Sequence, residues 1–190
     1  MKNIIIGGTV RSGKTTLANL LREKFGYSKV ESDTIVNAFD KVYPEFGITH
    51  RNPDLAREKY QPFLFEILNG FCRDLKYGGN ITVFPGAQFL PVNLSTYSKM
   101  NKYIVVFLGV NANTPEELLT KIREQDTEND WTLKKDDEWM LRFCKNIIEE
   151  SEKLKADCET YGFYYFNTFN DRPKVLCQIC DLIQRLQNEE

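Results

Sequence analysis

A short stretch near the N-terminus constrains this chain more than any other part of it. Three isoleucines at residues 4–6 are followed at once by Gly-Thr-Val-Arg-Ser-Gly-Lys-Thr at residues 8–15. This is the pattern of a loop that wraps a phosphate group with its backbone N–H groups. Apolar side chains then recur at helical spacing, at Leu17, Leu20, Leu21 and Phe25. Because a strand precedes the loop and an amphipathic helix follows it, the pattern predicts a nucleotide site rather than a chance match in a glycine-rich turn.

The parts of this pattern have distinct roles in binding a nucleotide. Glycine allows the backbone to turn tightly and to approach an anion closely. The N-terminus of the following helix directs its partial positive charge at the same anion. Lys14 is expected to reach the β- and γ-phosphates, and the Thr15 hydroxyl is expected to ligate Mg²⁺. We expect the nucleotide to contact Gly8, Arg11, Ser12, Gly13, Lys14, Thr15 and Thr16.

Composition argues against several classes of function. The chain carries 25 Lys and Arg against 27 Asp and Glu, a formal net charge of -2, and has no basic block, so binding to nucleic acid has no electrostatic support. No apolar run approaches the roughly 20 residues that span a membrane, and the N-terminus leads directly into a strand, so neither a membrane span nor a signal peptide is expected. Five cysteines suit a reducing cytoplasm, and a single histidine, His50, leaves no histidine-based metal cluster.

Strands and helices alternate along the chain. Further strands are expected at residues 27–31, 81–84, 103–109 and 163–167. Further helices are expected at residues 34–42, 52–77, 114–124, 136–161 and from 171 onward, with Pro62 kinking or splitting the second of these. The nearly continuous hydrophobicity of residues 103–109 is typical of a strand buried on both faces. The alternation predicts an α/β domain with a covered parallel sheet, whose ligands bind beyond the carboxyl ends of the strands.

In residues 8–15, in Ser32-Asp33, in Gly86 and in the order of its elements, the chain resembles the small P-loop kinases, the group that includes adenylate, shikimate and gluconate kinases. The resemblance implies a three-layer α/β/α P-loop NTPase fold with a five-stranded parallel sheet in the order 2-3-1-4-5. It implies that residues 1–190 form one domain, with an acceptor-binding helical region at about 34–78 and a helical lid at about 111–137. The implied activity is that of an ATP-dependent, Mg²⁺-requiring kinase of a small molecule.

Asp33 matches the acidic residue that this family places at the end of the second strand. There it faces the acceptor hydroxyl or the water shell of Mg²⁺, and a carboxylate near the γ-phosphate can accept the proton of the acceptor. The alternative is that Ser32 or Asp33 only caps the next helix. The chain departs from the family at Pro85, where many relatives have an acid. It also lacks the Asp-Gly-x-Pro-Arg stretch of nucleoside monophosphate kinases, which counts against their activity.

Phosphoryl transfer needs cations around the migrating group, and the family supplies them as lid arginines. Arg123 is the best positional match, although an ordinary surface charge is the alternative for this residue. The expected catalytic residues are therefore Lys14, Asp33 and Arg123.

The expected acceptor site combines Asp33 and Gly86 with the helical region. Gly86 matches the glycine that closes the third strand, where the substrate approaches the backbone. Gln88 either hydrogen-bonds a polar acceptor or lies in a solvated loop. Arg51 and Arg57 would bind a phosphate or carboxylate of the acceptor through paired N–H groups.

Two other functions remain open at this stage. Pro85 favours a nucleotide-binding module with weak or no catalysis, which would act as a sensor or bind a partner protein. Nucleotide hydrolysis for switching or mechanical work is disfavoured because the chain is short and lacks an Asp-x-x-Gly element after the third strand. The sequence identifies neither the acceptor nor the oligomeric state.

Overall fold

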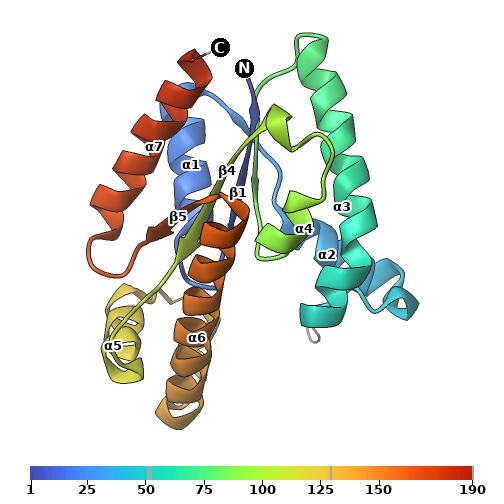
Figure 1. Ribbon diagram of the computed structural model, residues 1–190. Helices are drawn as coiled ribbons and strands as arrows, with labels where there is room; N and C mark the ends of the chain where they lie inside the picture. Colours follow the sequence, from blue (N-terminus) through green and yellow to red (C-terminus); the bar gives the residue numbers. More distant parts are fainter. Residues whose placement is uncertain (51–52, 129, 190) are drawn as a thin grey trace.

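A parallel five-stranded sheet in the order β2-β3-β1-β4-β5 forms the centre of the computed structural model (Figure 1). The structure describes residues 1–50, 53–128 and 130–189, without the side chains of residues 53–57. Every pair of neighbouring strands is parallel. The strands are β1 Asn3–Gly8, β2 Ser28–Lys29, β3 Thr82–Pro85, β4 Tyr103–Gly109 and β5 Tyr164–Asn167. The predicted strand order and fold class are confirmed.

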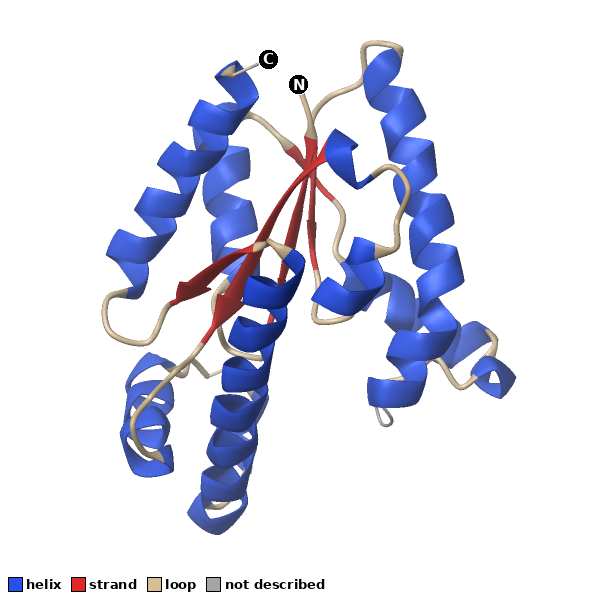
Figure 2. Cartoon of the chain, viewed as in Figure 1, coloured by secondary structure: helices blue, strands red, loops and turns tan. Residues whose placement is uncertain are grey.

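Helices cover both faces of this sheet, which gives the three layers of the fold (Figure 2). The α-helices are α1 Lys14–Phe25, α2 Ser32–Val42, α3 Pro53–Lys76, α4 Pro91–Ser95, α5 Pro115–Gln125, α6 Asp137–Tyr161 and α7 Arg172–Asn188. Three short 3-10 helices are η1 Pro44–Phe46, η2 Met100–Lys102 and η3 Trp131–Lys134. None of the described helices is long and apolar enough to cross a membrane.

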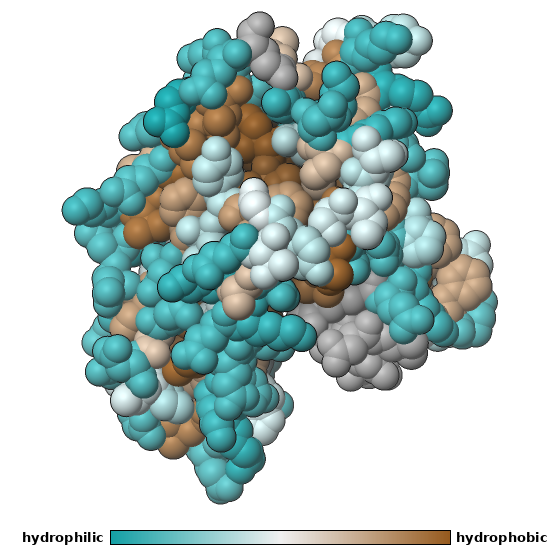
Figure 3. Space-filling view, in the orientation of Figure 1, coloured by the Kyte–Doolittle hydropathy of each residue, from teal (hydrophilic) through white to brown (hydrophobic). Residues whose placement is uncertain are grey.

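The isoleucine run of β1 divides its side chains between two cores. Ile4 and Ile6 pack with α1 and α7, whereas Ile5 packs with α3, α4 and α6 on the opposite face. Successive side chains of a strand point to opposite faces, so a strand covered on both sides is apolar at every position. Hydrophilic side chains cover the solvent side of α6 (Figure 3), because its apolar residues face α5 in the first half of the helix and the sheet in the second.

Several elements differ from the sequence expectation. The strand β2 is shorter than residues 27–31, and α2 begins at Ser32 rather than at Thr34. The helix α3 continues through Pro62, so of the two expected effects of this proline, a kink or a split, the split does not occur. Pro62 and Glu58 are both exposed, and the carbonyl group of Glu58, which loses its helical partner at the proline, is free to bond to water.

A third apolar cluster joins α5 to the first half of α6, beyond the carboxyl ends of the strands (Figure 1). Trp131 adds an aromatic edge to it, with ring centroids 5.8 Å from Trp139 and 5.3 Å from Phe143. We call residues 111–137 the lid segment. Its own small core gives this segment a defined structure next to the ligand-binding edge of the sheet.

Candidate active site

The phosphate-loop pattern forms the turn between β1 and α1. Gly8 has a backbone φ of 140° and Gly13 has a φ of 95°. Residues with a side chain rarely adopt φ values in this range. A β-carbon at Gly8 would also collide with the carbonyl oxygen of Leu108 in the neighbouring strand β4. Close contact between β1 and β4 therefore requires glycine where the loop begins.

Hydrogen bonds from polar side chains hold the loop in shape. Lys14 Nζ donates to the carbonyl oxygen of Thr9 at 2.6 Å, and Ser12 Oγ donates to the same oxygen at 2.8 Å. Thr168 Oγ1, from the loop after β5, donates to the carbonyl oxygen of Ser12 at 2.9 Å. No side chain caps the N-terminus of α1, which leaves that end of the helix for solvent or an anion.

A pocket of about 460 Å³ opens beside this loop, and we call it the phosphate pocket. It brings several of the expected site residues to one place: Arg11, Gly13, Lys14, Thr15, Thr16 and Asp33. Ala87, Gln125, Asp130 and Arg172 also line it. Ser12 is fully buried beneath the loop. The carboxyl ends of β1 and β3 thus meet the start of α2, as expected for a ligand site in a parallel sheet.

Asp33 is held by Gln88, whose Nε2 donates to Asp33 Oδ1 at 2.9 Å. Gln88 is only 8% exposed, so it does not lie in a solvated loop. Glu31 is the N-cap residue of α2 and no side chain makes the capping hydrogen bond, so Ser32 and Asp33 do not serve as the cap. A β-carbon at Gly86 would lie 2.6 Å from Ser32 Cβ, which explains why glycine follows β3.

Three buried polar atoms next to Asp33 have no hydrogen-bond partner among the described residues: Ser32 Oγ, Tyr60 Oη and Gln88 Oε1. Burial raises the pKa of Tyr60, and the charge of Asp33 contributes to the rise. Buried polar groups are normally paired with protein, water or ligand. The sequence analysis gave Ser32 no role beyond a possible helix cap and missed Tyr60 altogether. The signal in the sequence for Tyr60 was its hydroxyl group on the apolar face of α3, one turn before Leu64.

Arg172 is the cation that the sequence analysis missed. Its Nη2 donates to the carbonyl oxygen of Arg11 at 2.9 Å, and its Nη1 donates to Gln125 Oε1 at 2.7 Å. Burial lowers its pKa, and the positive charge of Arg11 lowers it further. Within the described chain no carboxylate pairs with Arg172, so this guanidinium is available to an anion on the loop. The signal for it was its position at the start of α7, after the loop that follows β5.

Arg11 connects the loop to the lid segment. Its guanidinium forms ion pairs with Asp126 and with Asp130, the latter at 2.6 Å. Hydrogen bonds from Thr127 and from Arg11 lower the pKa of Asp130 to about 2. Asp126 has no exposed side-chain surface. The residue expected to contact the nucleotide therefore also fastens the lid segment to the phosphate loop.

The structure does not bring Arg123 into the phosphate pocket. Its Nη1 donates to the carbonyl oxygen of Thr132 at 2.8 Å, and its Nη2 donates to that of Lys135 at 2.8 Å and to Asp137 Oδ1 at 3.0 Å. These bonds tie α5 to η3 and to the start of α6. Its catalytic role stays a prediction.

The positions of the two arginine side chains expected in the acceptor site, Arg51 and Arg57, are not described. Arg51 lies outside the described residues. Arg57 lies in α3, but its side chain is not among those described. Their contact with an acceptor stays a prediction.

The residues of the phosphate pocket fit Mg²⁺ together with a nucleotide. Among the described residues there is no group of three or more His, Cys, Asp or Glu that could hold a metal by itself. Thr15 and Asp33, however, line the same pocket and supply a hydroxyl and a carboxylate oxygen. Mg²⁺ is typically bound by one or two such groups, with water and substrate phosphates completing its coordination.

Comparison with known proteins finds similarity to two kinds of small-molecule kinase, shikimate kinases and a gluconokinase. No family model matches the chain. A shikimate kinase of Clostridium botulinum (strain Okra / Type B1) is 29% identical over 155 residues, which cover 80% of this chain and 84% of that protein. The crystal structure of a shikimate kinase from Bacteroides thetaiotaomicron has a TM-score of 0.54 at 19% identity and covers 98% of each chain. A gluconokinase from Sinorhizobium meliloti 1021 has a TM-score of 0.57 at 13% identity, covering 97% of this chain and 93% of that one. The two solved structures share the fold.

Proposed function

We propose that this chain is a P-loop small-molecule kinase. It transfers a phosphoryl group to a small-molecule acceptor, and the donor of that group is ATP bound on the loop between β1 and α1. The observation that carries this proposal is the phosphate pocket. It combines the N-terminus of α1, two cationic side chains (Lys14 and Arg172) and the carboxylate of Asp33. An anion would be attracted to the first three of these groups and a hydroxyl group to the fourth.

Lys14 and Arg172 have the charge needed on the nucleotide side of the site. The transferred phosphoryl group spreads negative charge over its oxygens, so catalysis consists mainly of positioning and charge stabilisation. Lys14 would move from the Thr9 carbonyl oxygen to the phosphates when the nucleotide binds. A Mg²⁺ ion held by Thr15 and, through water, by Asp33 would neutralise further phosphate charge.

Asp33 is the proposed acceptor of the proton. The hydroxyl oxygen of the acceptor forms a bond to the γ-phosphorus, the bond from that phosphorus to the β,γ-bridging oxygen breaks, and the hydroxyl proton passes to Asp33. Gln88 donates to Oδ1 and leaves Oδ2 for the acceptor. Pro85 ends β3 where an acid would otherwise stand, so Asp33 carries this role without a second carboxylate from that strand.

The region at about 34–78 and the lid segment are proposed to enclose the acceptor and to keep water away from the phosphoryl group. The bonds from Arg11 to Asp126 and Asp130 support this proposal, because they join the lid segment to the loop that would hold the phosphates. The five cysteines are free thiols, which supports a reducing, cytoplasmic environment.

The test measures ADP formation from MgATP over a panel of small hydroxylated metabolites, with Lys14→Ala as the blank and Asp33→Asn beside it. We expect at least one acceptor to increase ADP formation, and both variants to lose this activity by about a hundredfold or more. Activity that persists in Lys14→Ala would contradict the proposal. ATP binding by calorimetry without turnover of any acceptor would favour the alternative, a nucleotide-binding module, which Pro85 motivates.

A further inference from the structure

A second pocket adjoins the phosphate pocket, and we call it the side pocket. Its volume is about 260 Å³. It is lined by the start of the phosphate loop, by the loop after β3 with the start of α4, and by α6. Ala87 lines both pockets, and Gly8 and Thr9 begin the phosphate loop. A small molecule in the side pocket would therefore lie next to the phosphates of a bound nucleotide.

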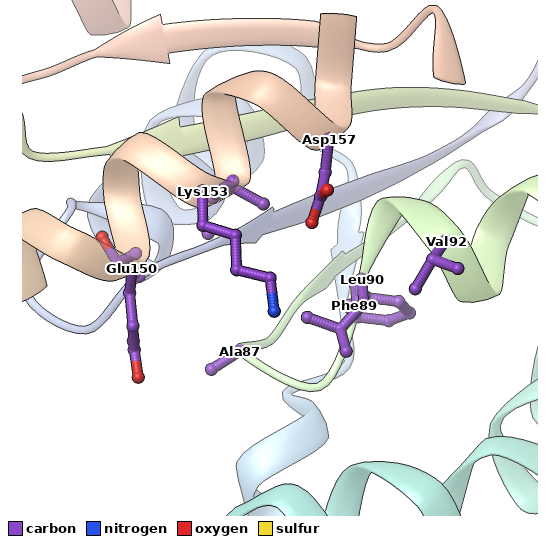
Figure 4. A pocket seen from close by; sticks show the side chains of 10 residues that line it. Ala87, Phe89, Leu90, Val92, Glu150, Lys153 and Asp157 are labelled. Atoms are coloured by element: carbon purple, nitrogen blue, oxygen red, sulfur yellow. The ribbon is translucent and has the colours of Figure 1, made fainter. Parts of the chain in front are cut away.

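One wall of the side pocket is a charged face of α6. Glu150, Lys153 and Asp157 are spaced by three and four residues, which places them on one side of the helix. In Figure 4 the ammonium group of Lys153 and the carboxylate of Asp157 extend from α6 toward the loop that carries Ala87 and Leu90. Charges of both signs thus face the same small space.

These three side chains form no ion pair with one another or with any other described residue. Elsewhere on the same helix such pairs do form, between Glu138 and Arg142 at 2.6 Å and between Lys145 and Glu149 at 3.8 Å. Lys153 and Asp157 have the same four-residue spacing but remain apart where they face the pocket. Both are therefore available to a ligand.

Apolar side chains complete the lining, from the loop after β3 and from α6 itself, and the position of α6 is fixed relative to the phosphate loop. Phe89 is 1% exposed and Leu154 is 7% exposed. The hydroxyl groups of Thr9 and Ser151 lie 3.1 Å apart, and Ser151 Oγ also accepts from the backbone N–H of Val110. The charged wall is thus held in place beside the loop.

We propose that the side pocket binds the non-reacting end of the phosphate acceptor, and that the acceptor is a small hydroxylated amino acid. Its carboxylate lies against Lys153, its ammonium group lies against Asp157, and its carbon chain lies against Phe89 and Leu154. The hydroxyl group reaches past Ala87 toward Asp33. This assignment rests on the proposed kinase function, and it names the substrate class for that site.

The sequence of charges on the wall favours a ligand that carries both signs. A lone carboxylate on Lys153 would also face the carboxylates of Glu150 and Asp157. A lone ammonium group on Asp157 would face Lys153. A zwitterion pairs its carboxylate with Lys153 and its ammonium group with Asp157, which gives selectivity against molecules with a single charge. The small volume limits the ligand to a compact molecule.

The test compares three matched probes on the intact protein with a non-hydrolysable ATP analogue bound. The probes are homoserine, the hydroxy acid that lacks its amine, and the amino alcohol that lacks its carboxylate; serine and the next longer homologue are measured in parallel. We expect one hydroxylated amino acid to bind about tenfold more tightly than either of its single-charge analogues, by calorimetry, because each analogue loses one charge-assisted contact. The same amino acid should stimulate ADP formation from MgATP.

Two variants should each remove the preference over a different analogue. In Lys153→Met the amino acid and the amino alcohol should bind equally, and in Asp157→Asn the amino acid and the hydroxy acid should bind equally. Lys155→Met and Glu159→Gln, at exposed positions of α6 that do not line the pocket, are the matched controls and should keep the wild-type preference.

Three results would overturn the assignment: no binding of any hydroxylated amino acid, equal binding of the three probes by the wild type, or an equal loss of all three in both variants. If another class of acceptor from the wider panel still stimulates ADP formation, only the substrate class is wrong. If no acceptor of any class does so while the ATP analogue binds, the proposed function itself fails.

Discussion

At the scale of single residues, the site depends on polar contacts made beside the phosphate loop. Gln88 contacts Asp33, and Arg172 contacts the backbone of Arg11. Neither residue belongs to the phosphate-loop pattern, yet each adjoins a group with a proposed role in the reaction. The two contacts make separate predictions, one for turnover and one for nucleotide affinity.

Gln88 is predicted to act as a positioning residue for Asp33. Gln88→Leu removes the donor to Asp33 Oδ1 and keeps a side chain of similar size. We expect kcat to fall by about tenfold, which corresponds to the free energy of roughly one hydrogen bond to a charged group. The Kd for ATP should be unchanged, because Gln88 does not line the phosphate pocket. Steady-state kinetics and calorimetry measure the two quantities, and a parallel loss of ATP affinity would instead indicate a general disturbance of the loop.

Arg172 is predicted to contribute to ATP affinity. Arg172→Met removes a partly buried guanidinium that no described carboxylate neutralises, so the Kd for ATP should rise by about tenfold or more. Arg185→Met, at the exposed far end of the same helix, is the control and should leave the Kd unchanged. Circular dichroism checks that both variants are folded. A wild-type Kd in Arg172→Met would exclude phosphate binding by this residue.

At the scale of elements, the lid segment is a small unit attached to the loop by charge. Its apolar cluster lies between α5 and α6, while Arg11 reaches it from the phosphate loop. Arg123 bonds to two backbone carbonyl groups within it, which is a structural use of a residue predicted to be catalytic. Trp131 lies in the lid segment, and Trp139, in the first turn of α6, packs against Trp131 and the apolar cluster. These are the two tryptophans of the chain, so intrinsic fluorescence reports on this region selectively.

The attachment of the lid segment is predicted to fail in acid. The pKa of Asp130 is lowered in the folded protein to about 2, from an ordinary value of 3.8, so its contribution is complete above pH 3.8 and is lost as the pH falls toward 2. Tryptophan fluorescence should therefore be constant from neutral pH to about 4 and change below it. Asp130→Asn should shift the neutral-pH spectrum toward the acid form. Far-UV circular dichroism separates this change from global unfolding, and a fluorescence transition that coincides with loss of helix would contradict a local event.

At the scale of the whole molecule, the parallel sheet brings the ligand-binding loops to one edge. The strands β1 and β4 pair along six residues, from Asn3 with Tyr103 to Gly8 with Leu108. The phosphate loop therefore begins against the backbone of β4. Both the packing of the sheet and the shape of the loop depend on Gly8.

Gly8→Ala is predicted to destabilise the whole domain. The new side chain would collide with the Leu108 carbonyl group, and strain at the positive φ adds to this cost, so we expect a loss of more than about 3 kcal/mol in the free energy of unfolding. Gly26→Ala is the matched control: it also has a positive φ, of 70°, but nothing lies near its β-carbon, and it should cost about 1 kcal/mol. Urea denaturation measures both, and equal costs would show that β4 gives way without strain.

The sequence by itself determined the nucleotide loop, the alternation of strands and helices, and, through the family resemblance, the order of the sheet. These features are local: the loop pattern spans eight residues, and hydrophobic periodicity distinguishes a strand from a helix within a short window. Only the tertiary structure decided which polar side chains surround the loop. Gln88 and Asp33 are 55 residues apart, and Arg172 and Arg11 are 161 residues apart. Such contacts depend on how separate elements pack, and no local pattern encodes that packing. For the same reason Arg172 rather than Arg123 lies in the phosphate pocket, and the charged face of α6 meets the loop after β3.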